Sequence, residues 1–160
     1  VTCVMEGVRP VLAEIQALVV PSSFGNPRRV SNGVEYNRAM LLLAVLEKRG
    51  GLLLGNCDAY LNVIGGLSLD EPAADLAAML ALASSFRDKP VPSDLAAIGE
   101  VGLTGELRAV SNLGQRLSEV RRLGFTKCLI PKRIQGKLAA PEGLELIRVA
   151  NIREALAALL

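Results

Sequence analysis

Residues 65–86, GGLSLDEPAADLAAMLALASSF, contain the stretch on which the prediction of the fold depends. At its centre, DEPAAD has the composition of a tight turn, and the apolar run that follows predicts a helix to about Phe86. Asp70 is a good N-cap residue, and the carboxylate of Glu71 favours the positive end of a helix dipole. The sequence therefore predicts a turn that delivers a small residue, Ala73, to the beginning of a helix.

A turn of this kind is also a suitable place for a nucleophile. Backbone N–H groups and the helix dipole can stabilise an oxyanion at the beginning of a helix. The residue found there is Ala73, whose methyl group cannot attack a carbonyl. The local sequence leaves two interpretations open: an ordinary helix cap, or an active site that has lost its reactive atom.

The composition of the 160 residues, 51% hydrophobic and 21% charged, is typical of a compact globule, and we expect one domain over residues 1–160. No apolar run approaches the ~20 residues that span a bilayer, so no membrane partner is expected. The chain starts without Met and in a strand-like pattern. We therefore expect a piece of a longer cytoplasmic protein.

The pattern of apolar residues and of turn residues predicts the following elements. Strands are expected at residues 1–6, 11–20, 59–64, 96–101, 106–110, 126–130 and 144–149, with a loop at residues 21–33. Helices are expected at residues 34–49, from DEPAAD to Phe86, and at residues 113–123 and 152–159. Ser31 or Asn32 is placed to cap the helix at residues 34–49, and Asn151 is placed to cap the helix at residues 152–159. This order predicts an α/β fold bordering on α+β, with helices packed on a mixed sheet.

Several chemistries are excluded by residues that the chain lacks. With no histidine, Ser-His-Asp and Cys-His arrangements are impossible. No GxxxxGK[ST] phosphate loop occurs, and the glycines at 99, 102 and 105 do not form the dinucleotide fingerprint. Cys3, Cys57 and Cys128 are far apart in sequence, which predicts reduced thiols and no zinc site. We therefore expect neither a cofactor nor a metal in this chain.

A second segment gives the turn a wider context. DEPAADLAAMLALAS, followed by residues 99–132, GEVGLTGELRAVSNLGQRLSEVRRLGFTKCLIPK, resembles the proteolytic domain of the Lon family. The resemblance implies a fold of the ribosomal protein S5 domain 2-like type. Lon enzymes carry a serine nucleophile in the turn and a lysine that activates it in the second segment.

Both reactive positions differ from the Lon pattern. When this sequence is aligned with the Lon pattern, the serine position corresponds to Ala73 and the lysine position to Gly114. A later basic position is kept as Arg116. A guanidinium does not deprotonate in proteins, so Arg116 cannot replace the lysine. The resemblance therefore implies a domain that is not an enzyme.

Residues 14–77 carry a closer resemblance. FGNPRR, YNRAMLLLAVLEKR and GGLSLDEPAADLA are similar to the C-terminal Lon-like domain of the bacterial RadA (Sms) recombination family. That resemblance implies a nucleoid-associated, hexameric motor for branch migration, with a RecA-type recombinase as a further partner. It also implies a zinc finger and a RecA-like ATPase in the parent protein, so ATP, Mg and Zn would belong to parts outside this chain.

For this domain the resemblance implies a hexamerisation platform and a weak, sequence-independent surface for single-stranded or branched DNA. The first candidates for DNA contact are Arg28 and Arg29, because an exposed loop can reach phosphates and arginine binds them in pairs of hydrogen bonds. Phe24 is the only aromatic residue beside them, so stacking on bases is not expected. Further candidates are Arg38, Arg108, Arg116, Lys132 and Arg133.

Alternatives to this function remain open at this point. Charged pairs are most often solvated surface, and Arg38 could equally lie on a helix face or contact a neighbouring subunit together with Asn37 and the DEPAAD turn. A degenerate protease cleft could be retained as a peptide or small-ligand binding module. An active peptidase would need another nucleophile, such as Cys57 or Ser68, and a base that the sequence does not provide.

Overall fold

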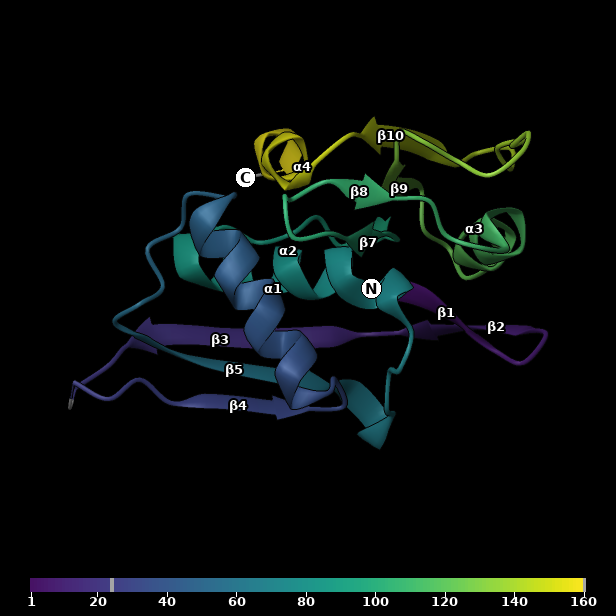
Figure 1. Ribbon diagram of the computed structural model, residues 1–160. Coiled ribbons are helices and arrows are strands. Elements are labelled where there is room, and N and C mark those ends of the chain that lie inside the picture. The colour runs from purple at the N-terminus through teal and green to yellow at the C-terminus, as the bar shows by residue number, and fades with distance from the viewer. Residues whose placement is uncertain (24, 160) are drawn as a thin grey trace.

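The computed structural model describes residues 1–23 and 25–159, so Phe24 lies outside the described residues. One sheet, with strand order β3-β5-β4, forms the lower layer in Figure 1. Strand β3 (Ile15–Pro21) is antiparallel to β5 (Cys57–Val63), whereas β4 (Arg29–Asn32) is parallel to β5. The lower sheet is therefore mixed.

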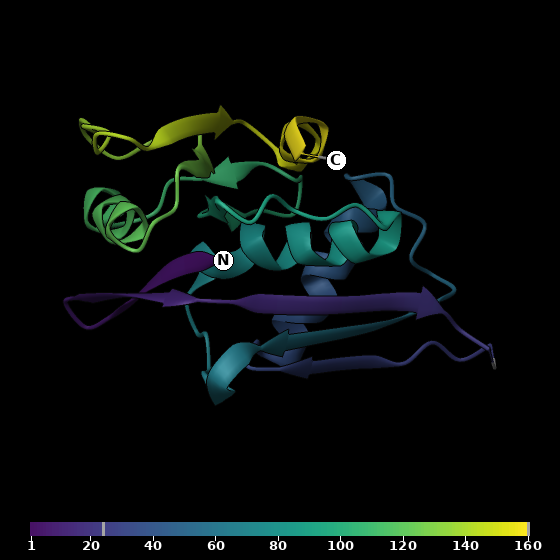
Figure 2. The same cartoon turned by 180° about the vertical axis from the view of Figure 1, so that it is seen from behind.

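The two faces of this sheet differ in what covers them. Alternate residues of β5 face the helices, and Ala59, Leu61 and Val63 are all buried. On the other face, Tyr60 lies between Leu18 and Val30 in the register of the three strands. Among the described residues, Figures 1 and 2 show helices on the first face alone, and Leu18 and Val30 on the second face are exposed.

Two helices cover the lower sheet. Helix α1 (Tyr36–Lys48) crosses it, and α2 (Asp75–Arg87) lies above β3 (Figure 1). Every residue of α2 from Asp75 to Leu80 is buried, which is the pattern of a helix enclosed on all sides. Helix α2 is therefore the centre of the core, and the turn that precedes it is fixed from several directions.

A second layer lies on the other side of α2 (Figure 2). Its parallel sheet has the order β10-β9-β6, and a short hairpin joins β7 to β8. The bounds are β6 (Leu95–Ala97), β7 (Glu100–Val101), β8 (Leu107–Arg108), β9 (Lys127–Pro131), β10 (Glu145–Val149) and α4 (Ile152–Leu159).

The remaining elements form one flank of the molecule. Strands β1 (Thr2–Glu6) and β2 (Arg9–Ala13) form an antiparallel hairpin, and α3 (Leu113–Arg122) packs against both of them. A short 3-10 helix, η1 (Ile64–Gly66), ends β5, and a second, η2 (Pro72–Ala74), leads into α2. No helix in the described part of the chain is long and apolar enough to cross a bilayer.

The predicted fold class, α/β with a mixed sheet and packed helices, is confirmed, and most element positions agree with the structure. Three strands were misjudged. The strand expected at 11–20 is divided at Glu14, and the one expected at 96–101 is divided between two sheets. The loop expected at 21–33 contains β4, whose sequence RVSN has no run of alternating apolar residues to reveal it.

Helix caps were predicted with mixed success. Asn151 caps α4, since its Oδ1 accepts a hydrogen bond from the Glu154 N–H at 2.9 Å. The cap of α1 is Glu35 instead of Ser31 or Asn32, and the Ser31 hydroxyl donates to the Val34 carbonyl. Asp70 caps nothing, because neither η2 nor α2 has a side-chain cap.

Candidate functional sites: the DEPAAD turn and a basic groove

Within the DEPAAD turn, Ala73 stands at the position that the Lon resemblance gives to the nucleophile, and it is buried. Ala73 lies in η2, is 3% exposed, and belongs to an apolar cluster that includes Cys3 and Leu117. Its carbonyl accepts from the Gly99 N–H at 2.9 Å, and the Leu76 N–H donates to the Gly99 carbonyl at 3.1 Å. These bonds hold the turn against the connection between β6 and β7, with a methyl group at the nucleophile position.

Gly114, at the lysine position, presents no side chain at all. It is the second residue of α3 and is exposed, and a Cβ placed on it would meet nothing within 4 Å. There is consequently space for a side chain at this position, but no group that could take a proton. The two positions thus differ in burial as well as in residue type.

The cysteines do not offer a substitute nucleophile. Burial raises the pKa of the Cys3 thiol to about 11 and that of Cys128 to about 12, which suppresses the reactive thiolate. Cys57 is half-buried and Ser68 is exposed, and the chain has no histidine that could act as the base beside either of them. A nucleophile next to a general base is therefore not found among them.

Arg116 does not lie on the surface, which corrects its assignment to DNA. Its side chain is 1% exposed and forms an ion pair with Glu71 of the turn. The Nη1 atom also donates to the Cys3 carbonyl at 2.9 Å, and Nε donates to the Ser111 carbonyl at 2.8 Å. One guanidinium therefore connects β1, the DEPAAD turn and α3, and no phosphate can reach it.

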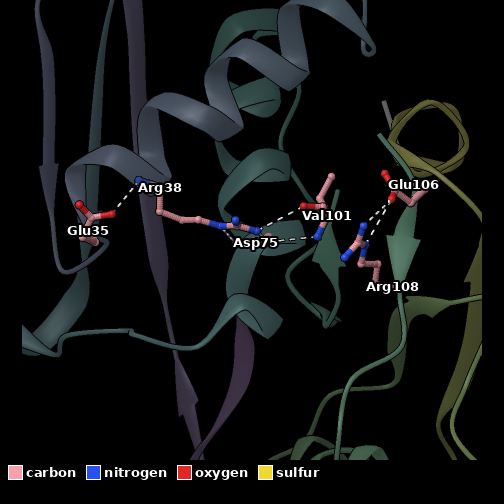
Figure 3. Close-up of polar contacts among 6 residues, drawn as sticks. All are labelled: Glu35, Arg38, Asp75, Val101, Glu106 and Arg108. Atoms are coloured by element: carbon pink, nitrogen blue, oxygen red, sulfur yellow. Dashed lines mark hydrogen bonds and ion pairs between the residues drawn. The ribbon is translucent and has the colours of Figure 1, made fainter. Parts of the chain in front are cut away.

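Arg38 is likewise committed within the fold. Figure 3 shows its guanidinium reaching from α1 to the Asp75 carboxylate, with which it forms an ion pair, and to the Val101 carbonyl at 3.2 Å. The Val101 N–H donates to Asp75 Oδ2 at 3.1 Å. These bonds hold the guanidinium within the fold, and the contacts of Arg38 with DNA or with a neighbouring subunit stay a prediction.

Burial and the ion pair itself both shift the pKa values of Asp75 and Arg38. Burial raises the pKa of the Asp75 carboxyl, while the hydrogen bonds from Arg38 and from the Val101 N–H oppose the rise. The carboxylate in turn raises the pKa of Arg38. The carboxylate side chain is 3% exposed and the guanidinium side chain 30%, so the pair is stabilised from one end by solvent.

A small pocket lies beside the turn but does not include Ala73. Its volume is about 280 Å³, and it extends from the beginning of α1 to the first turns of α2. The polar side chains that line it are acidic except for one, and comprise Glu35, Arg38, Asp70, Glu71 and Asp75. The pocket is thus a small, mostly acidic concavity next to the DEPAAD turn.

Three of the predicted cations come together elsewhere. Arg108 at the end of β8, and Lys132 and Arg133 directly after β9, line a groove of about 830 Å³. The Leu107 N–H donates to the Ala150 carbonyl at 2.9 Å, and the Lys132 N–H donates to the Val149 carbonyl at 2.9 Å. These backbone bonds hold the groove's walls together. We call it the basic groove; its other lining residues are Glu106, Leu107, Ala109 and Ala150.

The first candidates for DNA contact lie apart from this groove. Arg28 and Arg29 stand at the start of β4 in the lower sheet, whereas β8 and β9 belong to the upper layer (Figures 1 and 2). Arg28 is exposed, but Arg29 is half-buried and its Nη2 donates to the Leu54 carbonyl at 2.9 Å. The predicted set of cations is therefore divided between two surfaces and the interior.

The residues that sequence reasoning missed are the carboxylates. Glu71 and Asp75 hold the buried arginines, and Glu106 pairs with Arg108 in the basic groove. Neither buried pair is local in sequence, so helical spacing gives no signal for it. Among the described residues, no group of three or more His, Cys, Asp or Glu side chains could hold a metal ion.

Comparison with known families agrees with this architecture. The profile of the Lon protease (S16) C-terminal proteolytic domain matches residues 58–160, which include the DEPAAD turn, Gly114 and the basic groove. The chain therefore belongs to the family of Lon protease C-terminal proteolytic domains.

Similar proteins place the chain more narrowly within that family. It is 56% identical over 156 residues to the DNA repair protein RadA of Bacillus subtilis (strain 168), covering 98% of this chain and 34% of the relative. It is 52% identical over 152 residues to RadA of Streptococcus pneumoniae (strain R6), covering 95% of this chain and 36% of the relative. The chain spans about a third of the length of these relatives. The predicted resemblance to a Lon-like domain of RadA proteins is confirmed.

Proposed function

We propose that this chain is a Lon-type domain without peptidase activity, which serves a DNA repair protein as a DNA-binding and assembly module. The proposal is supported by the residues at the two positions that the Lon resemblance gives to the dyad, the buried methyl group of Ala73 and the hydrogen of Gly114. The relatives named as DNA repair proteins support the biological setting.

The absence of chemistry follows from what surrounds the turn. Peptide hydrolysis by a Ser–Lys dyad needs a hydroxyl and an amine that can lose its proton. The nearest buried cation is Arg116, whose guanidinium keeps its proton and is already bound to Glu71 and to two carbonyls. This arrangement stabilises the fold at the place where Lon enzymes carry out catalysis.

A peptidase assay tests this part of the proposal. We expect no hydrolysis of casein or of fluorogenic peptides by the purified chain, and no labelling by a serine-directed fluorophosphonate probe. A hydrolytic activity that accompanies the chain through purification, and disappears when a residue such as Cys57 or Ser68 is replaced, would contradict the proposal that the chain has no peptidase activity.

For DNA, the basic groove is the best supported surface. Arg108, Lys132 and Arg133 line one concavity, and the phosphates of a DNA backbone are the charges that such a group attracts. None of the lining residues is aromatic, so bases have no stacking platform and binding is independent of sequence. Arg28 would provide a separate and weaker contact, on single-stranded or branched DNA alike.

Assembly into a ring is the second part of the proposal. Of the large aliphatic side chains in the described residues, the most exposed are Val8 at 92%, Leu53 at 79% and Leu103 at 68%. Contact with a neighbouring copy would cover apolar surface of this kind. Mass photometry of the parent protein with Leu103→Ser should show fewer hexamers than the wild type; an unchanged distribution with every such variant would argue against these contacts.

The alternative is a module that binds a peptide or a small ligand in the pocket beside the DEPAAD turn. The pocket of about 280 Å³ beside the DEPAAD turn could accept a small basic group, because four of its polar lining residues are acidic. A thermal-shift screen with lysine- and arginine-containing peptides would favour this alternative if one of them stabilised the wild type and failed to stabilise Asp70→Asn.

The wider setting belongs to the parent protein. We propose that the parent is a nucleoid-associated recombination motor that uses ATP and Mg, carries a zinc finger, and cooperates with a RecA-type recombinase. This chain would supply the phosphate contacts and subunit contacts of that motor without binding a cofactor itself.

A further inference from the structure

One carboxylate lies among the cations of the basic groove. Glu106 Oε2 accepts hydrogen bonds from Arg108 Nε and Nη2, both at 3.2 Å (Figure 3). These are the two donors on one edge of the guanidinium, the edge with which arginine binds two oxygens of a phosphate. Glu106 therefore occupies the same donors that a DNA backbone would use.

The position of this carboxylate is fixed by the hairpin that carries it. Glu106 Oε1 accepts from the Thr104 hydroxyl at 2.6 Å and from the Thr104 N–H at 3.2 Å. A Cβ on Gly102 would come within 2.2 Å of the Glu106 carboxylate, so a residue with a side chain there would displace it. The turn between β7 and β8 is thus built to hold an anion against Arg108.

The charge on Glu106 persists at neutral pH. The hydrogen bond from the Thr104 hydroxyl, followed by the bonds from Arg108 and the Thr104 N–H, lowers the pKa of Glu106. The Arg108 and Glu106 side chains are 60% and 39% exposed, and such exposed pairs contribute little to stability. A phosphate can therefore displace the carboxylate from Arg108 at small cost to the fold.

We propose that Glu106 is an internal competitor for Arg108, which keeps the basic groove's affinity for the phosphodiester backbone low and its release fast. This inference rests on the proposed function of the basic groove as a DNA surface. While DNA is absent, the carboxylate neutralises Arg108. When a backbone enters the groove, a phosphate takes the guanidinium, and Lys132 and Arg133 provide the remaining positive charge.

The variant Glu106→Gln tests the inference, because the amide oxygen can still accept from Thr104 while the negative charge is lost. Binding of fluorescent duplex and single-stranded DNA to the chain would be measured between 50 and 200 mM salt. We expect affinity to rise about 3- to 10-fold at low salt, because a phosphate no longer has to displace a carboxylate from Arg108, while the slope of log affinity against log salt stays nearly the same, since Arg108 contacts a phosphate in both proteins.

A matched control separates the groove from net charge. Glu119 forms a similar pair with Arg122 on α3, with Nε–Oε1 at 2.6 Å and Nη2–Oε2 at 2.9 Å, and does not line the groove. Glu119→Gln changes the net charge by the same amount and should leave both affinity and slope nearly unchanged. In the double variant Glu106→Gln/Arg108→Ala, the gain from Glu106→Gln should disappear.

The outcomes distinguish this inference from the function on which it rests. If Lys132→Ala/Arg133→Ala weakens binding but Glu106→Gln does not strengthen it, the competitor role is wrong and the DNA surface stands. If Glu106→Gln and Glu119→Gln strengthen binding equally, net charge explains the gain and the inference falls. If the wild type binds no DNA even at 50 mM salt, the proposed function itself is wrong.

Discussion

The DEPAAD turn and the basic groove use the same kind of side chain for opposite purposes. At the turn, Arg38 and Arg116 are bound by Asp75 and Glu71 and hold segments of the fold together. In the groove, Arg108 is more than half exposed, beside Lys132 and Arg133 at the surface. The comparison teaches that an arginine in this chain is structural where at least one partner of its ion pair is buried, and remains available for a phosphate where both partners are exposed to solvent.

The energetics of the two regions should differ accordingly. Removal of one partner from a buried pair leaves an uncompensated charge without water, which is strongly destabilising. Removal of an exposed cation has little effect on stability, because solvent replaces its partner. Variants at the turn should therefore change the stability of the chain, and variants in the groove should change its binding.

The largest effect is expected at Arg116. Arg116→Ala removes the ion pair with Glu71 and leaves the carbonyls of Cys3 and Ser111 without this donor. We expect a loss of about 3–5 kcal/mol in the free energy of unfolding, measured by urea denaturation. The double variant Glu71→Gln/Arg116→Met should recover part of the loss. A loss below about 1 kcal/mol for Arg116→Ala would mean that the pair is not structural.

Arg38→Ala should have a smaller effect that depends on pH. The change leaves the Asp75 carboxylate buried, but the Val101 N–H still donates to it and it can take up a proton, so we expect a loss of about 2 kcal/mol at pH 7. Burial raises the pKa of Asp75, and removal of Arg38 takes away a group that opposes the rise. The protonated form of Asp75 then fits the fold better than the carboxylate does.

The sign of the pH dependence follows from that shift. When the pKa of a carboxyl is higher in the folded than in the unfolded chain, its contribution to stability is fully present below the unfolded pKa and is lost as pH rises through the folded pKa. Arg38→Ala should therefore destabilise less at pH 4 than at pH 7, relative to the wild type at the same pH. Equal losses at the two pH values would show that Asp75 does not titrate in the variant.

Arg28 and Arg29 allow the same comparison between a structural and an exposed arginine, with a smaller expected effect on stability. Arg29→Ala removes the bond to the Leu54 carbonyl and should cost about 1 kcal/mol of stability, whereas Arg28→Ala should cost less than about 0.5 kcal/mol. In DNA binding the order should reverse, because Arg28 is exposed. Denaturation and fluorescence anisotropy on both variants would reveal whether this reversal occurs.

How far the sequence predicts this molecule depends on whether a feature is local. The helices are found from periodicity, and Asn151 caps α4 because its partner is three residues away. β4 is missed because RVSN pairs in parallel with β5, in which the partner of Arg29 is Ala59, 30 residues further along the chain, and the pattern of RVSN itself carries no signal. Ser31 does not cap α1, because the bridge of Val34 with Leu69 lies between Ser31 and the helix. Asp70 does not cap α2, because η2 lies between them.

The candidate site shows the same limit. The positions of Ala73 and Gly114 come from a linear motif, which needs no knowledge of packing. The partners of Arg38 and Arg116 lie 37 and 45 residues away, so the sequence could not reveal that these arginines are occupied. Nor could it reveal that Arg108 and the pair after β9 line one groove, since the fold alone brings them together.

The measurement that tests the account most directly is the salt dependence of DNA binding by the wild type, by Lys132→Ala/Arg133→Ala and by the folded control Arg28→Ala. We expect the groove variant to keep the wild-type free energy of unfolding, to bind about 10-fold more weakly at low salt, and to lose about 1.8 from the slope of log affinity against log salt. Arg28→Ala should lose less than half as much. Wild-type affinity and slope in the groove variant would contradict the division between a structural turn and a DNA-binding groove.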